Sequence, residues 1–218
     1  MFFRTPFFLP PLLPKLVWRI PTEAKKIYLT FDDGPMPGPT EFVLETLKKF
    51  EARATFFCIG DNIRKYPEIF SRILSEGHSI GNHTFNHLKG WKYSTGDYLN
   101  NIEACDQQIQ LLKSDQSTGS SQSLGIQGNL FRPPYGRITL SQIAALQNKY
   151  RVIMWDVLSQ DYNQSVSEIN CLKGSIKATR PGSIVVFHDS LKAERNLIYA
   201  LPRYLEHFSN LDYVFSAL

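Results

Sequence analysis

The 218 residues of this chain, 43% of them hydrophobic, can bury one substantial core, so a single domain is expected rather than two. The formal net charge of +4 is spread along the sequence without a block of lysine or arginine, which argues against a nucleic-acid partner. Three cysteines without CxxC spacing (Cys58, Cys105 and Cys171) indicate neither a disulfide framework nor a thiolate zinc site, and they are expected to be buried as small apolar residues.

Residues 1–24 are predicted to form an N-terminal extended arm, and residues 25–218 a single domain. The first 21 residues are apolar and carry Arg4, as a secretory signal does, but four prolines between residues 6 and 14 would break its helix. No small-residue cleavage site follows before Ile27, so an arm packed on the domain surface is favoured over a signal or a membrane anchor. Elsewhere no apolar run reaches 18 residues, and no membrane span is expected.

Short apolar runs alternate with longer amphipathic ones, which is the pattern of βα units around a parallel sheet. Strands are predicted over residues 27–31, 54–59, 79–81, 129–131, 151–157, 183–187 and 213–215. Helices are predicted over residues 40–50, 66–76 with Asp61 as its cap, from Ser94 or Thr95 to about 112, 165–178 and 193–208. Residues 113–129, rich in Ser, Gln and Gly, are predicted to form a mobile polar surface loop.

Two adjacent carboxylates, Asp32 and Asp33, follow the first predicted strand and precede Gly34 and Pro35. Neighbouring carboxylates repel each other, so a bound cation or a proton-transfer role would give a physical reason for keeping the pair. The alternative is an ordinary turn after a strand. The chemistry of this turn therefore depends on what the rest of the chain brings to it.

His83 and His87 are spaced i, i+4, so on one helical turn both imidazoles would project to the same side and could share a cation. Capping or surface roles are the alternative. Together with one aspartate, the two histidines would give a site that leaves positions open for water and substrate. A catalytic metal centre needs such open positions.

Two further segments end predicted strands with polar groups. Arg132 begins a loop with two prolines that would leave the sheet rigidly at its carboxyl end, where α/β barrels hold their active sites. Arg132 could form a surface ion pair, or it could orient a carboxylate of the acidic turn. His188, followed by Asp189, could donate a proton, or its ring could simply be hydrogen-bonded in the rim of the sheet.

Five segments of the chain together resemble the motifs of the NodB-type polysaccharide deacetylases, carbohydrate esterase family 4. These are residues 30–35 (TFDDGP), 83–87 (HTFNH), 132–136 (RPPYG), 155–162 (WDVLSQDY) and 186–189 (VFHD). They occur in the order of that family, and the resemblance covers about residues 25–215. It implies an α/β fold, the distorted (β/α)7-type barrel of the NodB homology domain. It also implies removal of N- or O-acetyl groups from sugar polymers with a divalent metal, most commonly zinc, with cobalt or a similar ion as the alternative.

The resemblance implies a role for each matching residue. Asp33, His83 and His87 would bind the metal, and Asp32 would be the general base that deprotonates water. Arg132 would orient Asp32, the backbone N–H of Tyr135 would help to hold the oxyanion, and His188 would protonate the leaving group.

The fourth motif departs from the family pattern of Asp, two variable residues, Asp and Trp, in which the first Asp supports the catalytic histidine. Alignment on Asp161 puts Leu158 at that first position and Tyr162 at the Trp position. Leucine cannot hydrogen-bond an imidazolium, so either Asp161 or Asp156 reaches His188 by another route, or the pKa of His188 differs from that of relatives. Tyr162, Val186 and Trp155 are expected to form an aromatic and apolar wall for the substrate, with a core role for Trp155 as the alternative.

The sequence therefore predicts a metal-dependent hydrolase that removes acetyl groups, with N-acetyl expected, from a sugar polymer or glycan. The alternatives are a catalytically weak carbohydrate-binding relative and a hydrolase of a small non-sugar amide, because fold alone does not choose the substrate. An acetylated glycan is the expected partner. A cell-wall substrate would place the protein at the cell envelope, whereas the lack of a convincing signal peptide would place it in the cytoplasm, so both localisations stay open. The oligomeric state also stays open.

Overall fold

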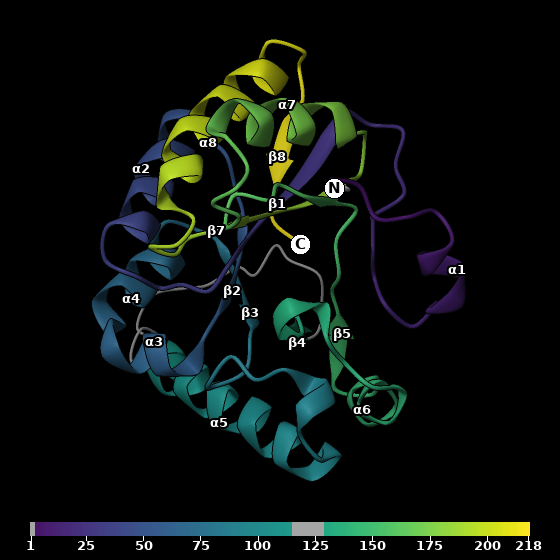
Figure 1. The fold of residues 1–218 in the computed structure, drawn as a ribbon. Helices are drawn as coiled ribbons and strands as arrows, with labels where there is room; N and C mark the ends of the chain where they lie inside the picture. The colour runs from purple at the N-terminus through teal and green to yellow at the C-terminus, as the bar shows by residue number, and fades with distance from the viewer. Residues whose placement is uncertain (1–2, 115–128) are drawn as a thin grey trace.

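The computed structural model describes residues 3–114 and 129–218 (Figure 1). In this part of the chain, eight parallel strands form one sheet in the order β5-β4-β3-β2-β1-β7-β6, and β8 pairs with β1. The strands are β1 (Lys26–Asp32), β2 (Thr55–Cys58), β3 (Ser79–Asn82), β4 (Asn129–Phe131), β5 (Tyr150–Val152), β6 (Val157–Leu158), β7 (Ile184–His188) and β8 (Val214–Ser216).

Helices follow most of the strands, as the alternating pattern predicts. They are α1 (Leu9–Leu12), α2 (Pro39–Lys49), α3 (Gly60–Lys65), α4 (Pro67–Ser75), α5 (Thr95–Ser114), α6 (Leu140–Leu146), α7 (Glu168–Ala178) and α8 (Glu194–Ser209). Short 3₁₀ turns lie at Gly90–Lys92 and Pro134–Gly136.

The central strand β1 determines where polar residues meet. Its register places Asp32 opposite His188 of β7 and opposite Phe57 of β2. Because neighbouring parallel strands end at the same edge of the sheet, side chains that are distant in sequence are brought to one end of the barrel. Thr30, two residues earlier on the same face, pairs with Val186.

The other face of β1 belongs to the hydrophobic core. The ring of Phe31 stacks on Phe56 and Phe187, with centroid distances of 5.1 and 6.2 Å. Apolar residues of α2, α7 and α8, among them Leu44 and Leu201, complete this core. The helices bury their apolar stripes against the sheet and so hold its polar edge in place.

The strand predicted over residues 151–157 is wrong as one element, because the N-terminal residues interrupt it. Met154 N–H donates to the carbonyl of Val17 (2.7 Å), and Val17 N–H donates to the carbonyl of Val152 (2.9 Å). Thr5 N–H donates to the carbonyl of Asp156 (2.8 Å). The arm thus lies along the gap between β5 and β6, the two end strands of the sheet order, and satisfies backbone groups that a neighbouring strand would otherwise bond.

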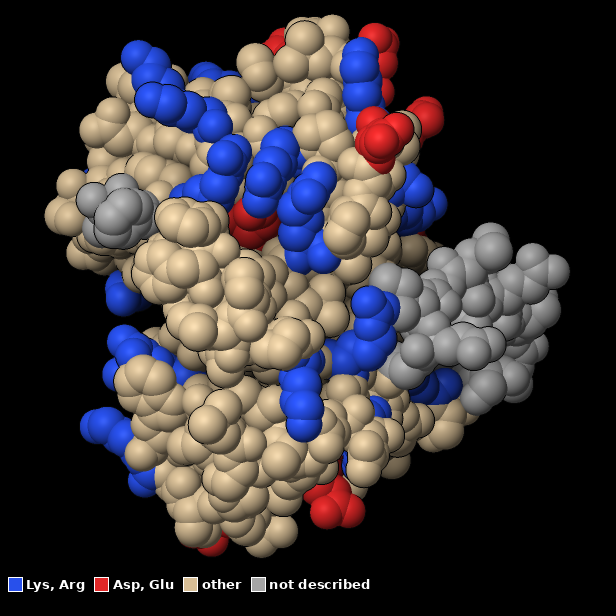
Figure 2. All heavy atoms as spheres, turned by 90° about the vertical axis from the view of Figure 1, so that its right-hand side faces the viewer, with Lys and Arg blue, Asp and Glu red and all other residues tan. Residues whose placement is uncertain are grey.

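The same N-terminal segment contains the short helix α1, which an extended arm would lack. Around it Phe7 is 90%, Leu12 69% and Phe8 52% exposed. Figure 2 views the side of the molecule on which Figure 1 places α1 and α6, and lysine and arginine side chains gather there around uncharged surface. No helix among residues 3–114 and 129–218 combines the length and the apolar character that a membrane span requires.

Several helix boundaries differ from prediction for identifiable reasons. A helix does form within residues 66–76, α4 (Pro67–Ser75), but Asp61 does not cap it. Asp61 lies in the separate helix α3, where it pairs with Arg64 (2.7 Å) and Lys65 (2.5 Å). Pro67 begins α4 and separates the two helices.

Other local predictions are confirmed. The hydroxyl of Ser94 accepts a hydrogen bond from Asp97 N–H (3.1 Å) at the start of α5. All three cysteines are buried and free. The loop predicted over 113–129 falls mainly on residues 115–128, which lie outside the described residues.

Candidate active site

The acidic turn at the end of β1 is held by Asp189, the residue that follows β7. Asp189 accepts hydrogen bonds from Gly34 N–H (3.0 Å) and from the Thr40 hydroxyl (2.6 Å). A Cβ at Gly34 would lie 2.0 Å from Oδ2 of Asp189, so only glycine fits this close approach. The carbonyl of Asp33 accepts a further hydrogen bond from Asn62 (2.7 Å). The turn therefore holds the carboxylates of Asp32 and Asp33 on a rigid backbone.

Three potential metal ligands converge above this turn. One ligand atom each from Asp33, His83 and His87 lies within 4.8 Å of the others. Nε2 of His87 is 3.1 Å and Nε2 of His83 is 3.7 Å from Oδ1 of Asp33. One carboxylate and two imidazoles are a donor set that suits Zn²⁺ and related ions, and it leaves coordination positions free for water and substrate. The residues present thus fit the implied metal.

The helical turn predicted for His83 and His87 is wrong. Residues 83–87 form a loop in which Thr84 (φ 63°) and His87 (φ 56°) adopt left-handed backbone angles. The loop is held by Asn82, whose side chain accepts from Thr84 N–H (2.8 Å). The two imidazoles still reach the same point, but loop geometry and not helical periodicity brings them there.

The protonation states of His83 and Asp33 suit metal binding. Nδ1 of His83 lies 2.8 Å from the carbonyl of Arg132, so this nitrogen donates and Nε2 faces Asp33 with its lone pair. Burial lowers the pKa of His83 to about 4, which keeps its ring neutral. Burial alone would raise the pKa of Asp33, but hydrogen bonding by His87 and the charge of nearby histidines place it well below its usual range. A neutral imidazole and an ionised carboxylate are the forms that bind a cation.

The second carboxylate, Asp32, is held by a buried arginine. Nη1 of Arg132 donates to Oδ1 of Asp32 (2.6 Å) and to the Thr30 hydroxyl (2.7 Å). Nη2 of Arg132 donates to the carbonyl of Met154 (2.9 Å), and the ring of Phe57 lies 4.1 Å from the guanidinium carbon. Arg132 is fully buried, so a surface ion pair, the alternative considered from sequence, is wrong. This pair fixes the direction of Asp32 beside the three ligands.

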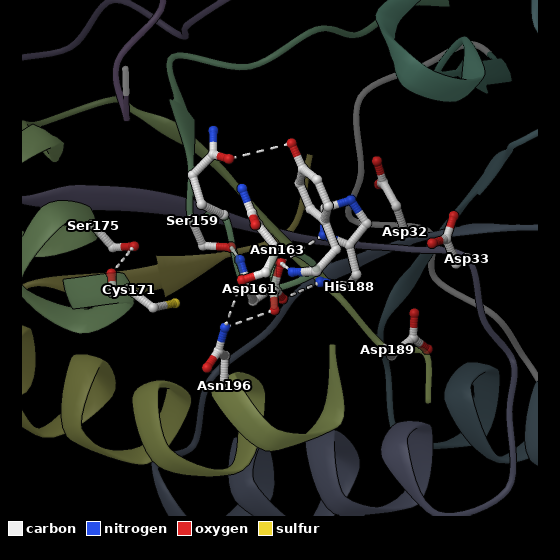
Figure 3. A network of polar contacts seen from close by, with 12 residues as sticks. Asp32, Asp33, Ser159, Asp161, Asn163, Cys171, Ser175, His188, Asp189 and Asn196 are labelled. Atoms are coloured by element: carbon white, nitrogen blue, oxygen red, sulfur yellow. Dashed lines mark hydrogen bonds and ion pairs between the residues drawn. The ribbon is translucent and has the colours of Figure 1, made fainter. Parts of the chain in front are cut away.

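His188 and its partner form the opposite side of the site (Figure 3). Nδ1 of His188 lies 2.7 Å from Oδ1 of Asp161, whose other oxygen accepts from the backbone N–H of His188 (2.7 Å). Burial alone would lower the pKa of His188, but the Asp161 carboxylate outweighs it and raises the pKa to about 9. The ring is therefore protonated at neutral pH, with Nε2 available as a donor.

Leu158 stands where an aspartate of the family motif would support the histidine, but His188 still has a carboxylate partner. Asp161 itself supports His188, and Asn196 holds the Asp161 backbone by donating to its carbonyl (3.0 Å). Asp156 is engaged elsewhere, with Arg180 and Ser183. Leu158 therefore removes no hydrogen bond from the histidine.

The residues predicted to form the substrate wall do not all lie at the surface. The ring of Tyr162 packs edge-on against His188, with centroids 4.9 Å apart. Trp155 lies beneath the loop of Gly136, where an added Cβ would meet its ring at 2.7 Å, and it packs on a hydrophobic cluster. Val186 is fully buried in β7, so it offers a substrate no surface in this structure, and its predicted contact is not supported. Tyr135 is 54% exposed, with its ring 4.5 Å from that of His87.

Sequence reasoning missed the supporting residues of the site. Asp189 belongs to the VFHD segment, but that motif alone does not predict its hydrogen bonds to the acidic turn. Burial raises the pKa of Asp189 to about 8, in spite of the hydrogen bonds from Thr40 and Gly34. Its position directly after His188, in register with the end of β1, was the available signal.

A sequence model described as polysaccharide deacetylase matches residues 19–153. The chain belongs to the polysaccharide deacetylase family. A peptidoglycan-N-acetylglucosamine deacetylase of Bacillus cereus is 32% identical over 171 residues, which cover 78% of this chain and 58% of that protein. A second Bacillus cereus protein of the same name is 32% identical over 207 residues. The match covers 92% of this chain and 89% of that protein.

The fold is also that of a solved family member. The crystal structure of the Bc1960 peptidoglycan N-acetylglucosamine deacetylase in complex with a hydroxamate-type benzamide matches with a TM-score of 0.84 and 28% identity. The match covers 98% of this chain and 95% of the other. The predicted family and fold are thereby confirmed.

Proposed function

We propose that this polysaccharide deacetylase is a metal-dependent hydrolase that removes N-acetyl groups from the amino sugars of a cell-wall glycan. One observation carries the proposal: an aspartate and two histidines meet within 4.8 Å beside a second, arginine-held aspartate. The names of the Bacillus cereus relatives, which act on N-acetylglucosamine of peptidoglycan, support the same substrate class.

The metal would be held by Asp33, His83 and His87. Zinc is the proposed ion, because mixed imidazole and carboxylate donors suit it, and cobalt accepts similar donors. A divalent cation there would polarise the acetyl carbonyl and lower the pKa of a water molecule toward about 7.

Asp32 accepts the proton of the attacking water. Its neighbour Arg132 is buried and donates to Oδ1 at 2.6 Å, which leaves the other carboxylate oxygen to face the reacting water. A positioned carboxylate of this kind contributes a factor of about 10²–10⁴ to the rate in general-base catalysis.

His188 donates a proton to the departing sugar nitrogen. Its pKa of about 9 keeps the ring protonated, and Asp161 stabilises the charge until the proton is transferred. The backbone N–H of Tyr135, in a loop with φ of 59°, is proposed to stabilise the oxyanion. The base and the acid thus act from opposite sides of one acetyl group.

Acetate release from an N-acetylglucosamine oligomer, with and without Zn²⁺, tests the proposal. The Asp32→Asn variant is expected to lose activity by about 10²–10⁴ while it retains metal, measured by elemental analysis. Asp97→Asn, at the start of α5, is the control and should behave as the unaltered protein. Full activity of Asp32→Asn, or no acetate from any glycan with bound metal, would contradict the assignment.

A further inference from the structure

Three cations lie on aromatic rings around the mouth of the site. Nζ of Lys89 is 4.4 Å from the ring centre of Tyr135, and the guanidinium carbon of Arg137 is 4.2 Å from that of Trp91. Nζ of Lys192 is 5.6 Å from the ring centre of Tyr162. We name Lys89, Arg137 and Lys192 the cationic rim.

The aromatic partners connect this rim to both sides of the reaction centre. The ring of Tyr135 lies 4.5 Å from that of the ligand His87, and the ring of Tyr162 lies 4.9 Å from that of His188. Trp91 is tied to the same loop as Tyr135, because its indole N–H donates to the carbonyl of Ile138 (2.8 Å). The rim therefore flanks the position of the reacting acetyl group on two sides.

The charge of the rim is not neutralised within the described residues. All three cations are exposed, and no carboxylate of residues 3–114 or 129–218 lies within 4.0 Å of their nitrogens. By contrast, Arg64 and Lys65 on α3 both pair with Asp61. Cation–ring contacts fix the position of a positive charge without cancelling it, so the rim presents an attractive field to an anion.

The rim also offers a surface for sugar rings. Trp91 is 60% exposed although Arg137 covers one face, and Tyr135 is 54% exposed. An exposed aromatic ring packs on the apolar face of a sugar, while the adjacent cation pairs with a charged substituent. A neutral glycan would use the rings and leave the three charges without partners.

We infer that the substrate is an acidic glycan, in which carboxylate groups on the sugars next to the reacting N-acetyl group pair with Lys89, Arg137 and Lys192. This inference rests on the proposed deacetylase function and names its substrate class. Trp91 stacks on a sugar ring of the same glycan. The guanidinium of Arg137, held over the ring of Trp91, can pair with a planar carboxylate through two parallel N–H groups.

The test compares chitohexaose with 6-O-carboxymethyl chitohexaose, which share a backbone and differ in charge. At low salt, kcat/KM for acetate release is expected to be at least about fivefold higher for the carboxymethyl form, because each exposed ion pair contributes up to about that factor. The ratio of the two kcat/KM values should fall toward one in about 0.5 M NaCl, where surface charges are screened.

Arg137→Gln and Lys89→Gln are expected to reduce this preference by about two- to fivefold each. Lys49→Gln, on the exposed side of α2, is the matched control and should keep the preference. A preference that is unchanged in both rim variants would overturn the inference. So would stronger selection of 6-O-phosphoryl chitohexaose, which would assign the rim to phosphate.

Binding to the Asp32→Asn protein, measured by calorimetry, separates the two proposals. Tighter binding of the carboxymethyl oligomer supports the acidic substrate even if neither oligomer is turned over, whereas equal binding overturns it. If the unaltered protein releases acetate from chitohexaose with no preference for charge, the deacetylase function stands and the acidic-substrate inference fails.

Discussion

His83 and His188 lie on opposite sides of the same site, His83 fully buried and His188 largely so, yet their protonation differs. The pKa of His83 falls to about 4, and that of His188 rises to about 9. Nδ1 of His83 faces a backbone carbonyl, whereas Nδ1 of His188 faces the carboxylate of Asp161. Burial lowers the pKa of any imidazole, so the group behind the ring decides whether it can bind a metal or donate a proton.

The largest expected effect comes from removing a ligand on the metal side. His87→Ala should lose metal affinity by more than the factor of about 10–100 that loss of a supporting group costs. Addition of Zn²⁺ should raise the melting temperature of the unaltered protein and of the control His207→Ala, but not of His87→Ala. Equal zinc stabilisation of all three proteins would remove His87 from the ligand set.

On the acid side, Asp161→Asn should lower kcat by a factor of about 10²–10⁴, because an amide cannot stabilise the imidazolium. The basic limb of the pH–rate profile, expected near the His188 pKa of about 9, should move to lower pH. An NMR titration of the His188 ring measures this directly. An unshifted pKa would mean that Asp161 does not control the histidine.

The same pair predicts how stability depends on pH in metal-free protein. The pKa of His188 is higher in the folded protein (about 9) than its usual value of 6.5, so the folded state binds the proton more tightly. Its contribution is fully present below pH 6.5 and is lost as pH rises to about 9. Urea unfolding across this range should show the loss, and Asp161→Asn should lack it.

Gly34→Ala tests the backbone that joins the two sides. The added Cβ would lie 2.0 Å from the Asp189 carboxylate, so we expect a loss of about 1–3 kcal/mol in the free energy of unfolding. Gly96→Ala, where an added Cβ would meet its nearest neighbour at 3.9 Å, is the control. Urea denaturation of both variants measures the difference, and equal stability would contradict the close approach.

The smallest effect is expected at Tyr162. Tyr162→Phe removes the hydroxyl, which donates to Gln160 at 3.3 Å, but keeps the ring against His188. Acetate release should change by less than about fivefold, since one long hydrogen bond contributes about 1 kcal/mol or less. A larger loss would assign the hydroxyl a role in substrate binding.

Much of this protein was determined by its sequence. Residues such as Asp33 and His83 follow apolar runs with βα spacing, and parallel strands carry them to one edge of the sheet whatever the details of the loops. The motifs also identified the family, and strands such as β4 were predicted to the residue.

Tertiary structure decided what depends on groups distant in the chain. Val17 hydrogen-bonds to the backbone of Val152 and Met154 and so splits a predicted strand in two, although residues 152–155 are all apolar. The Asp32–Arg132 pair joins residues 100 positions apart, and Asp161 reaches His188 across 27 positions. Local pattern determines which elements form, but a hydrogen-bond partner is chosen by the packing of whole elements, and that is why the support of His188 could not be read from Leu158.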